Sequence, residues 1–152
     1  MHRPNTLRTA LALCAAATLP LAAAPANATA TRTVNGSSED GGLGHGPSGK
    51  GTMRVDWTGS GYVSPTIQVN VTDDWANNHA AAAIVFWTRR DNSNWFERVI
   101  TAGRKGATAS RTLRPTQDRT LTEVTMVGVK WCRWNAVKGY APHCGAEHKI
   151  FF

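Results

Sequence analysis

The apolar positions beyond residue 52 recur with a period of two, which is the spacing of β-strands rather than of helices. Residues 66–72 alternate most clearly, with Ile67, Val69 and Val71 on one face and polar side chains on the other. Residues 81–89 are apolar on both faces, which predicts a central strand that is covered on two sides. The same reasoning predicts further strands at 53–57, 95–101, 107–113, 121–132 and 147–152.

Turn-forming residues separate these segments. Asp, Asn, Gly, Ser and Pro occur at 90–94, 103–106 and 115–118, and no segment shows a convincing helical period. Short strands with frequent turns are typical of an all-β domain. We therefore predict an antiparallel β-sandwich of about seven strands, or a small barrel, with one disulfide.

The N-terminal region has the features of a secretion signal peptide. Arg3 and Arg8 precede an apolar run at 11–24, and small residues suited to cleavage follow up to Ala28 and Ala30. This run is shorter than the ~20 residues that span a membrane, and no later segment is long enough either. We expect a signal peptide at 1–28 and a secreted, extracellular protein without a transmembrane segment. Abundant alanine and the excess of Arg over Lys indicate a bacterial origin.

The residues after the signal are rich in glycine and serine. Between 31 and 51 the chain has almost no apolar side chains, so burial cannot offset the entropy that is lost when such a segment becomes ordered. We predict a flexible arm at 29–51, followed by the β-sandwich domain at 52–152.

Two cysteines remain after removal of the signal, because Cys14 lies within it. An even pair in an exported protein predicts a disulfide between Cys132 and Cys144. Closing the loop between them stabilises the fold by ~3 kcal/mol on the chain-entropy estimate. We expect this bridge to close the base of a long hairpin that ends in the last strand.

The loop inside the bridge contains aromatic and basic side chains. Exposed aromatic rings beside cations suit sugar rings or nucleobases, with phosphate or uronate groups on the cations. The alternative is that Trp134 folds back over the end of the sandwich and that the loop is only a structural staple. The candidate ligand-binding residues are Arg133, Trp134, Lys138, Tyr140 and His143.

The net charge favours anionic partners. Loss of Arg3 and Arg8 with the signal lowers the number of Lys and Arg from 17 to 15, against 10 Asp and Glu, so the mature chain carries +5. A basic stripe on the sheet would form a track for a polyanion, although charged residues also protect a solvated sheet edge. The candidate members of this stripe are Arg89, Arg90, Arg98, Arg111 and Arg114.

The signs of catalysis are weak. His143, Glu147 and His148, with His79 elsewhere in the chain, are candidates for proton transfer in a small basic hydrolase. However, Glu147 and His148 are neighbours in a predicted strand and point to opposite faces. No motif of a serine hydrolase, a phosphate-binding loop or a zinc protease is present.

A second polar cluster lies at 73–79. It contains Asp73, Asp74 and His79, and its oxygen ligands are of the type that calcium prefers. The spacing matches no calcium loop, and Asp and Asn after a strand are typical of a turn. We therefore predict no bound metal and no cofactor.

These observations favour a secreted, non-catalytic binding module. Its expected ligand is an extracellular or wall polysaccharide or another anionic polymer, bound by the aromatic and basic residues of the disulfide loop. Two other functions stay open. One is a ribonuclease-like hydrolase or toxin, and the other is an inhibitor that presents the disulfide loop to a protease.

Overall fold

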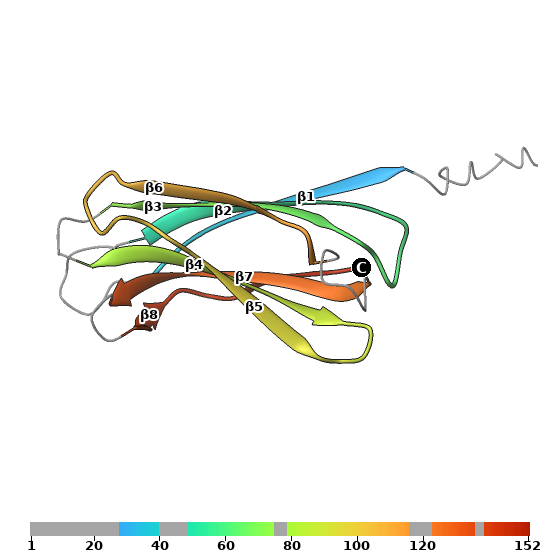
Figure 1. The fold of residues 1–152 in the computed structure, drawn as a ribbon. Coiled ribbons are helices and arrows are strands. Elements are labelled where there is room, and N and C mark those ends of the chain that lie inside the picture. The colour runs from blue at the N-terminus through green and yellow to red at the C-terminus, as the bar shows by residue number, and fades with distance from the viewer. Residues whose placement is uncertain (1–27, 40–48, 75–78, 116–122, 136–138) are drawn as a thin grey trace, which may run out of the picture.

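The computed structural model describes residues 28–39, 49–74, 79–115, 123–135 and 139–152, apart from the side chains of Tyr140 and Pro142. Two antiparallel sheets lie face to face (Figure 1). Sheet A has the order β1-β2-β3-β6, which are the strands Thr29–Ser37, Gly49–Thr58, Thr66–Asp73 and Thr108–Leu113. Sheet B has the order β5-β4-β7-β8, which are Asn94–Ile100, Ala80–Arg89, Val124–Asn135 and Tyr140–Cys144. The last strand, β9 (His148–Phe151), also pairs with β7.

This architecture confirms the predicted antiparallel β-sandwich. It has nine strands where the sequence predicts about seven, and the strands that the periodicity missed are β1 and β8. β8 has only five residues, and one of them is a proline. A segment this short does not show a recognisable alternation. In the part of the chain that the structure describes, there is no helix that could span a membrane.

β1 and the start of β2 correct the prediction of a flexible arm at 29–51, of which residues 40–48 lie outside the described ranges. β1 pairs with β2 along its whole length, from Thr29 opposite Thr58 to Ser37 opposite Lys50, and β2 itself begins at Gly49. The member of β1 that packs against the core is Val34, while most of its other side chains are polar. β1 is an edge strand held by backbone hydrogen bonds, and such pairing leaves no signal in the hydrophobic pattern.

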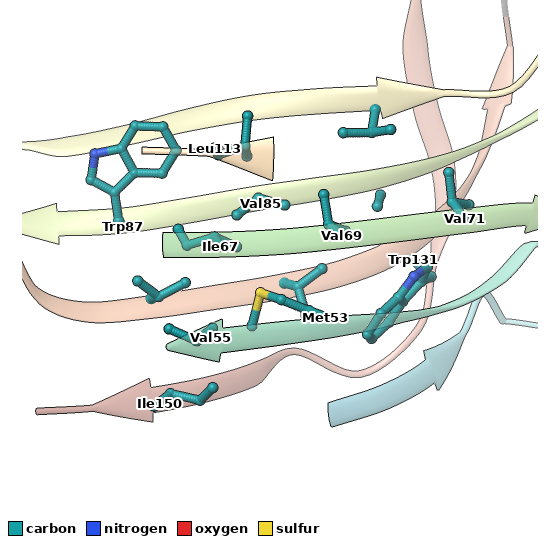
Figure 2. Packing of buried hydrophobic residues seen from close by; sticks show 14 of the residues in the cluster. Met53, Val55, Ile67, Val69, Val71, Val85, Trp87, Leu113, Trp131 and Ile150 are labelled. Atoms are coloured by element: carbon teal, nitrogen blue, oxygen red, sulfur yellow. The ribbon is translucent and has the colours of Figure 1, made fainter. Parts of the chain in front are cut away.

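The core lies between the two sheets (Figure 2). Because side chains of a strand alternate, each sheet turns one set of apolar side chains inward; the outer face of sheet A is polar, whereas that of sheet B carries a second, smaller apolar cluster. Burying one such side chain stabilises the fold by ~1.5–3 kcal/mol. Sheet A contributes Met53, Val55, Ile67, Val69 and Val71, and sheet B contributes Val85, Trp87, Val127, Val129, Trp131 and Ile150.

Trp131 connects the two sheets. It is fully buried, and its indole nitrogen donates a hydrogen bond of 3.2 Å to the carbonyl oxygen of Asn70. Gly36 and Gly51 are partners across β1 and β2, and their lack of side chains leaves the room that this ring occupies. A Cβ atom at Gly36 would lie 2.4 Å from Cε3 of Trp131, which is too close for any side chain to be tolerated without movement.

Candidate functional site

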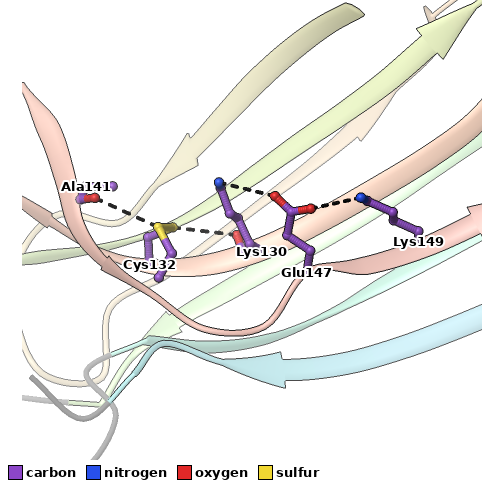
Figure 3. Close-up of polar contacts among 6 residues, drawn as sticks. Lys130, Cys132, Ala141, Glu147 and Lys149 are labelled. Atoms are coloured by element: carbon purple, nitrogen blue, oxygen red, sulfur yellow. Dashed lines mark hydrogen bonds and ion pairs between the residues drawn. A yellow bond between two sulfur atoms is a disulfide. The ribbon is translucent and has the colours of Figure 1, made fainter.

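The disulfide joins β7 and β8. Cys132 and Cys144 are direct partners across these strands, and their sulfur atoms are 2.07 Å apart. The two sulfurs lie 4.0 and 3.9 Å from the carbonyl oxygens of Lys130 and Ala141 (Figure 3). Disulfide sulfurs carry no proton, so these are packing contacts. The predicted disulfide is therefore present, and it closes the base of the β7–β8 hairpin, whose strands continue beyond it to Asn135 and Tyr140. The last strand, β9, is not part of this hairpin.

Trp134 does not have the exposed position that a ligand-stacking ring needs. β7 continues to Asn135, so Trp134 belongs to a strand and is only 8% exposed. The guanidinium carbon of Arg98 lies 5.3 Å from its ring centroid. Small side chains on the outer face of sheet B leave room for the ring, which packs against Ala80, Ala82 and Ala141. The expectation of an exposed Trp134 is wrong, and the alternative of a ring folded onto the sandwich is closer to the observed packing.

Arg133 and His143 are partners across β7 and β8. Nη2 of Arg133 lies 3.2 Å from Nε2 and 3.3 Å from Nδ1 of His79, a neighbour from the start of β4 that the sequence does not connect with it. Two other candidates for ligand binding, Lys138 and the side chain of Tyr140, lie outside the described residues. The structure thus brings together two of the five predicted residues, and a ligand site in the disulfide hairpin stays a prediction.

The candidate catalytic residues near the C-terminus lie on different faces. Glu147 forms ion pairs of 3.1 Å with Lys149 and 3.5 Å with Lys130 (Figure 3). The hydrogen bond from Lys149 is the main cause that lowers the pKa of Glu147, which makes this carboxylate a weaker base. The ring of His148 lies instead against Trp131, with 5.7 Å between the centroids. Glu147 and His148 therefore do not form an acid–base pair.

The polar cluster at 73–79 is only partly described, because residues 75–78 lie outside the described ranges. Asp73 ends β3 and is fully buried, whereas Asp74 pairs with Lys50 at 2.7 Å. Among the residues that the structure places, no three His, Cys, Asp or Glu side chains form a group that could hold a metal ion.

A more distinctive arrangement lies where β5 and β6 approach each other. These are edge strands of sheets B and A, and a shallow hollow of about 360 Å³ opens between them. We call this hollow the edge pocket. Two tryptophans, three arginines and a glutamate contribute to its lining: Trp87, Trp95, Arg89, Arg111, Arg114 and Glu97.

The β4–β5 hairpin forms the aromatic side of the edge pocket. Trp87 and Trp95 are direct partners across the hairpin, and Arg89 follows Trp87 by two residues on the same face. The guanidinium carbon of Arg89 lies 4.2 Å from the ring centroid of Trp95, which is a cation–π contact that orients the cation. Trp95 is 44% exposed and Arg89 is 5% exposed. The pocket therefore presents an accessible ring with a buried positive charge against it.

The indole nitrogen of Trp87 is a further polar group in this region. The side chain is buried, and the nitrogen has no hydrogen-bond acceptor within the described part of the chain. Figure 2 shows its six-membered ring turned toward Leu113 and its nitrogen on the side away from the other labelled core residues. Buried donors of this kind are few in folded proteins.

The β6 side of the edge pocket carries positive charge. Nη1 of Arg111 lies 3.2 Å from Oε2 of Glu97, and this ion pair spans the gap between β6 and β5. Arg114 is exposed just beyond the end of β6. In the neighbouring turn, a hydrogen bond from the hydroxyl of Ser93 is the main cause that lowers the pKa of Asp91. Even with this second carboxylate included, the three arginines leave an excess of positive charge, which attracts anions.

The edge pocket contains three of the five arginines in the predicted basic stripe. The other two lie elsewhere: Arg90 stacks on Tyr62 at 4.9 Å and pairs with Glu123, whereas Arg98 stacks on Phe96. β4 ends at Arg89, so Arg90 lies in the turn that follows, and the two neighbouring arginines stack on different rings.

Sequence reasoning did not find the part that Trp87 and Trp95 play. Their meeting depends on the register of the β4–β5 hairpin, in which Thr88 faces Asn94 and Trp87 faces Trp95. The available signal was the turn at 90–93, since a tight turn centred there puts these two tryptophans opposite each other.

Comparisons with known protein families, with curated proteins and with solved structures found no match. The geometry and chemistry of the edge pocket are therefore the basis on which a function can be inferred.

Proposed function

We propose that the protein is a non-catalytic binding module for an anionic polymer, and that the edge pocket binds the acidic groups of this polymer. The observation that carries the proposal is the stacking of buried Arg89 on the exposed ring of Trp95, beside Arg111 and Arg114. A guanidinium that is already oriented loses less freedom when it binds a carboxylate, sulfate or phosphate. The ring itself can stack on a flat ligand face.

An extracellular location is part of this proposal. The predicted signal peptide and the disulfide between Cys132 and Cys144 support it, because such bonds persist in oxidising compartments. Acidic polysaccharides of walls and extracellular matrices are polyanions that such a module would meet. After loss of Arg3 and Arg8 with the signal, 15 of the 17 Lys and Arg remain against 10 Asp and Glu, and this excess would increase its rate of association with them.

Isothermal titration calorimetry of the mature chain tests the proposal. The ligands are polygalacturonate and polyphosphate, with uncharged dextran as the reference. We expect both polyanions to bind and dextran to bind much more weakly. Arg111→Gln and Arg114→Gln should each weaken polyanion binding by about tenfold, which is the loss of one charge-assisted contact. The matched control is Arg104→Gln, which removes the same charge from the exposed turn between β5 and β6.

Two outcomes would contradict the edge pocket as the site. Equal losses in Arg114→Gln and Arg104→Gln would mean that only net charge matters. Binding that survives Trp95→Leu unchanged would mean that the ring and the cation it orients have no part in recognition. A repeat at about 0.5 M salt, where the Debye length is only about 4 Å, separates the contacts in the pocket from long-range attraction.

A further inference from the structure

The outer face of sheet A is polar from one edge to the other. The register aligns its outward side chains in rows that cross all four strands. One row is Thr33, Arg54, Gln68 and Thr112, and the next is Asn35, Thr52, Asn70 and Ser110. Every member of these rows carries a hydroxyl, amide or guanidinium group, so a ligand on this face meets hydrogen-bonding groups throughout.

This face is hollowed along the rows. A hollow of about 490 Å³ is lined by residues from β1, β2, β3 and β6, and a second, of about 520 Å³, shares Thr52 and Asn70 with it. The first hollow also shares Arg111 and Thr112 with the edge pocket. The three hollows are therefore neighbours on the surface, with β6 between the first hollow and the edge pocket. We call the two on sheet A the polar groove.

The charges of the polar groove are balanced, unlike those of the edge pocket. Nε of Arg54 lies 3.1 Å from Oδ1 of Asp56, and Nζ of Lys50 lies 2.7 Å from Oδ2 of Asp74. A ligand would thus meet an excess of positive charge at the edge pocket and a nearly neutral, hydrogen-bonding surface beyond it.

We propose that the polar groove extends the edge pocket into one elongated site, and that its ligand is an acidic polysaccharide chain. The inference rests on the proposed function, because the edge pocket supplies the part that binds the acidic group. Hydroxyl and amide side chains can exchange hydrogen bonds with the many hydroxyls of neutral sugars. With strands ~4.8 Å apart, the four strands of sheet A span about 14 Å, which is the length of a short oligosaccharide rather than of a single sugar.

A single-stranded nucleic acid fits this surface less well. Its recognition needs aromatic rings for successive bases and a cation for successive phosphates. The two rows contain one arginine, which is already paired with Asp56, and no aromatic ring. The chemistry of the groove therefore favours a chain in which neutral sugars accompany the acidic unit.

Hyaluronan oligosaccharides, in which glucuronate alternates with a neutral amino sugar, are a suitable probe. We expect the Kd measured by calorimetry to fall at least tenfold from the disaccharide to the octasaccharide. The double variant Gln68→Ala/Ser110→Ala should lose this dependence on length while its affinity for the disaccharide stays unchanged. The matched control is Thr58→Ala/Thr66→Ala, which removes two hydroxyls from sheet A outside the lining of the groove.

The possible failures are distinguishable. The polar groove is overturned if oligosaccharides of all lengths bind with equal affinity, or if Gln68→Ala/Ser110→Ala leaves the length dependence intact. In either case, the edge pocket still stands if Arg114→Gln weakens binding. Length-dependent binding of polyphosphate or oligodeoxythymidylate in place of the oligosaccharides would overturn the choice of a polysaccharide. If none of these polyanions binds, both the groove and the proposed function fail.

Discussion

At the scale of single residues, the position of a strand end decides which aromatic ring a ligand can reach. Trp134 and Trp95 have the same side chain and each lies within 6 Å of an arginine guanidinium carbon. β7 carries Trp134 onto the alanines of sheet B, whereas Trp95 lies at the start of the edge strand β5 and stays 44% exposed. The sequence analysis identifies Trp134 and not Trp95 as a candidate for stacking, because residue type alone does not tell which ring is covered.

Glu147 provides a prediction at the same scale. Its pKa is lowered from 4.5, first by the hydrogen bond from Lys149 and less by Lys130. A lowered carboxyl pKa stabilises the folded state at pH values above the unfolded pKa, and this stabilisation is lost as the pH falls through the folded pKa. We expect Lys149→Ala to raise the pKa of Glu147 more than Lys130→Ala does, in an NMR titration of the side-chain carboxyl. Identical titrations of Glu147 in the wild type and both variants would contradict the assigned ion pairs.

At the scale of elements, apolar alternation predicts the strands whose side chains form the core. It misses the strands that are held mainly by backbone hydrogen bonds to a neighbour. β3 and β4 have clear apolar patterns and are predicted almost to the residue. β1 presents mostly polar side chains on an edge, so the same rule mistakes it for a flexible arm. The edge pocket was beyond prediction for a related reason, since it depends on which strands become the edges of their sheets.

The disulfide makes a testable contribution to one element. β8 is a five-residue edge strand whose register with β7 is interrupted between Arg133 and Asn135, and the disulfide at Cys144 ties its end covalently to β7. We expect Cys132→Ala/Cys144→Ala to lower the free energy of unfolding in urea by ~3 kcal/mol. Hydrogen exchange should show lost amide protection in β8 and retained protection in β4. A decrease below ~1 kcal/mol, or a uniform loss of protection, would show that the bridge does not act locally.

At the scale of the whole molecule, the disulfide and the edge pocket lie near opposite ends of β4. Ala82 is the partner of Cys132, whereas Arg89 lines the edge pocket seven residues further along the strand. At ~3.3 Å per residue, this separation is about 23 Å. Sites this far apart that share no contacts act independently in most proteins. The two candidate sites, the loop that the sequence indicates and the pocket that the structure reveals, can therefore be tested separately.

The Cys132→Ala/Cys144→Ala variant makes this separation measurable. If the edge pocket binds the polyanion, the folded variant should bind polygalacturonate within about twofold of the wild-type affinity, because the pocket and β4 are intact. Arg114→Gln, in a protein with its disulfide, should weaken the same binding by about tenfold. Circular dichroism at the assay temperature establishes that both variants are folded. The reverse pattern, with binding lost in the cysteine variant and kept in Arg114→Gln, would place the ligand at the disulfide hairpin and reject the edge pocket.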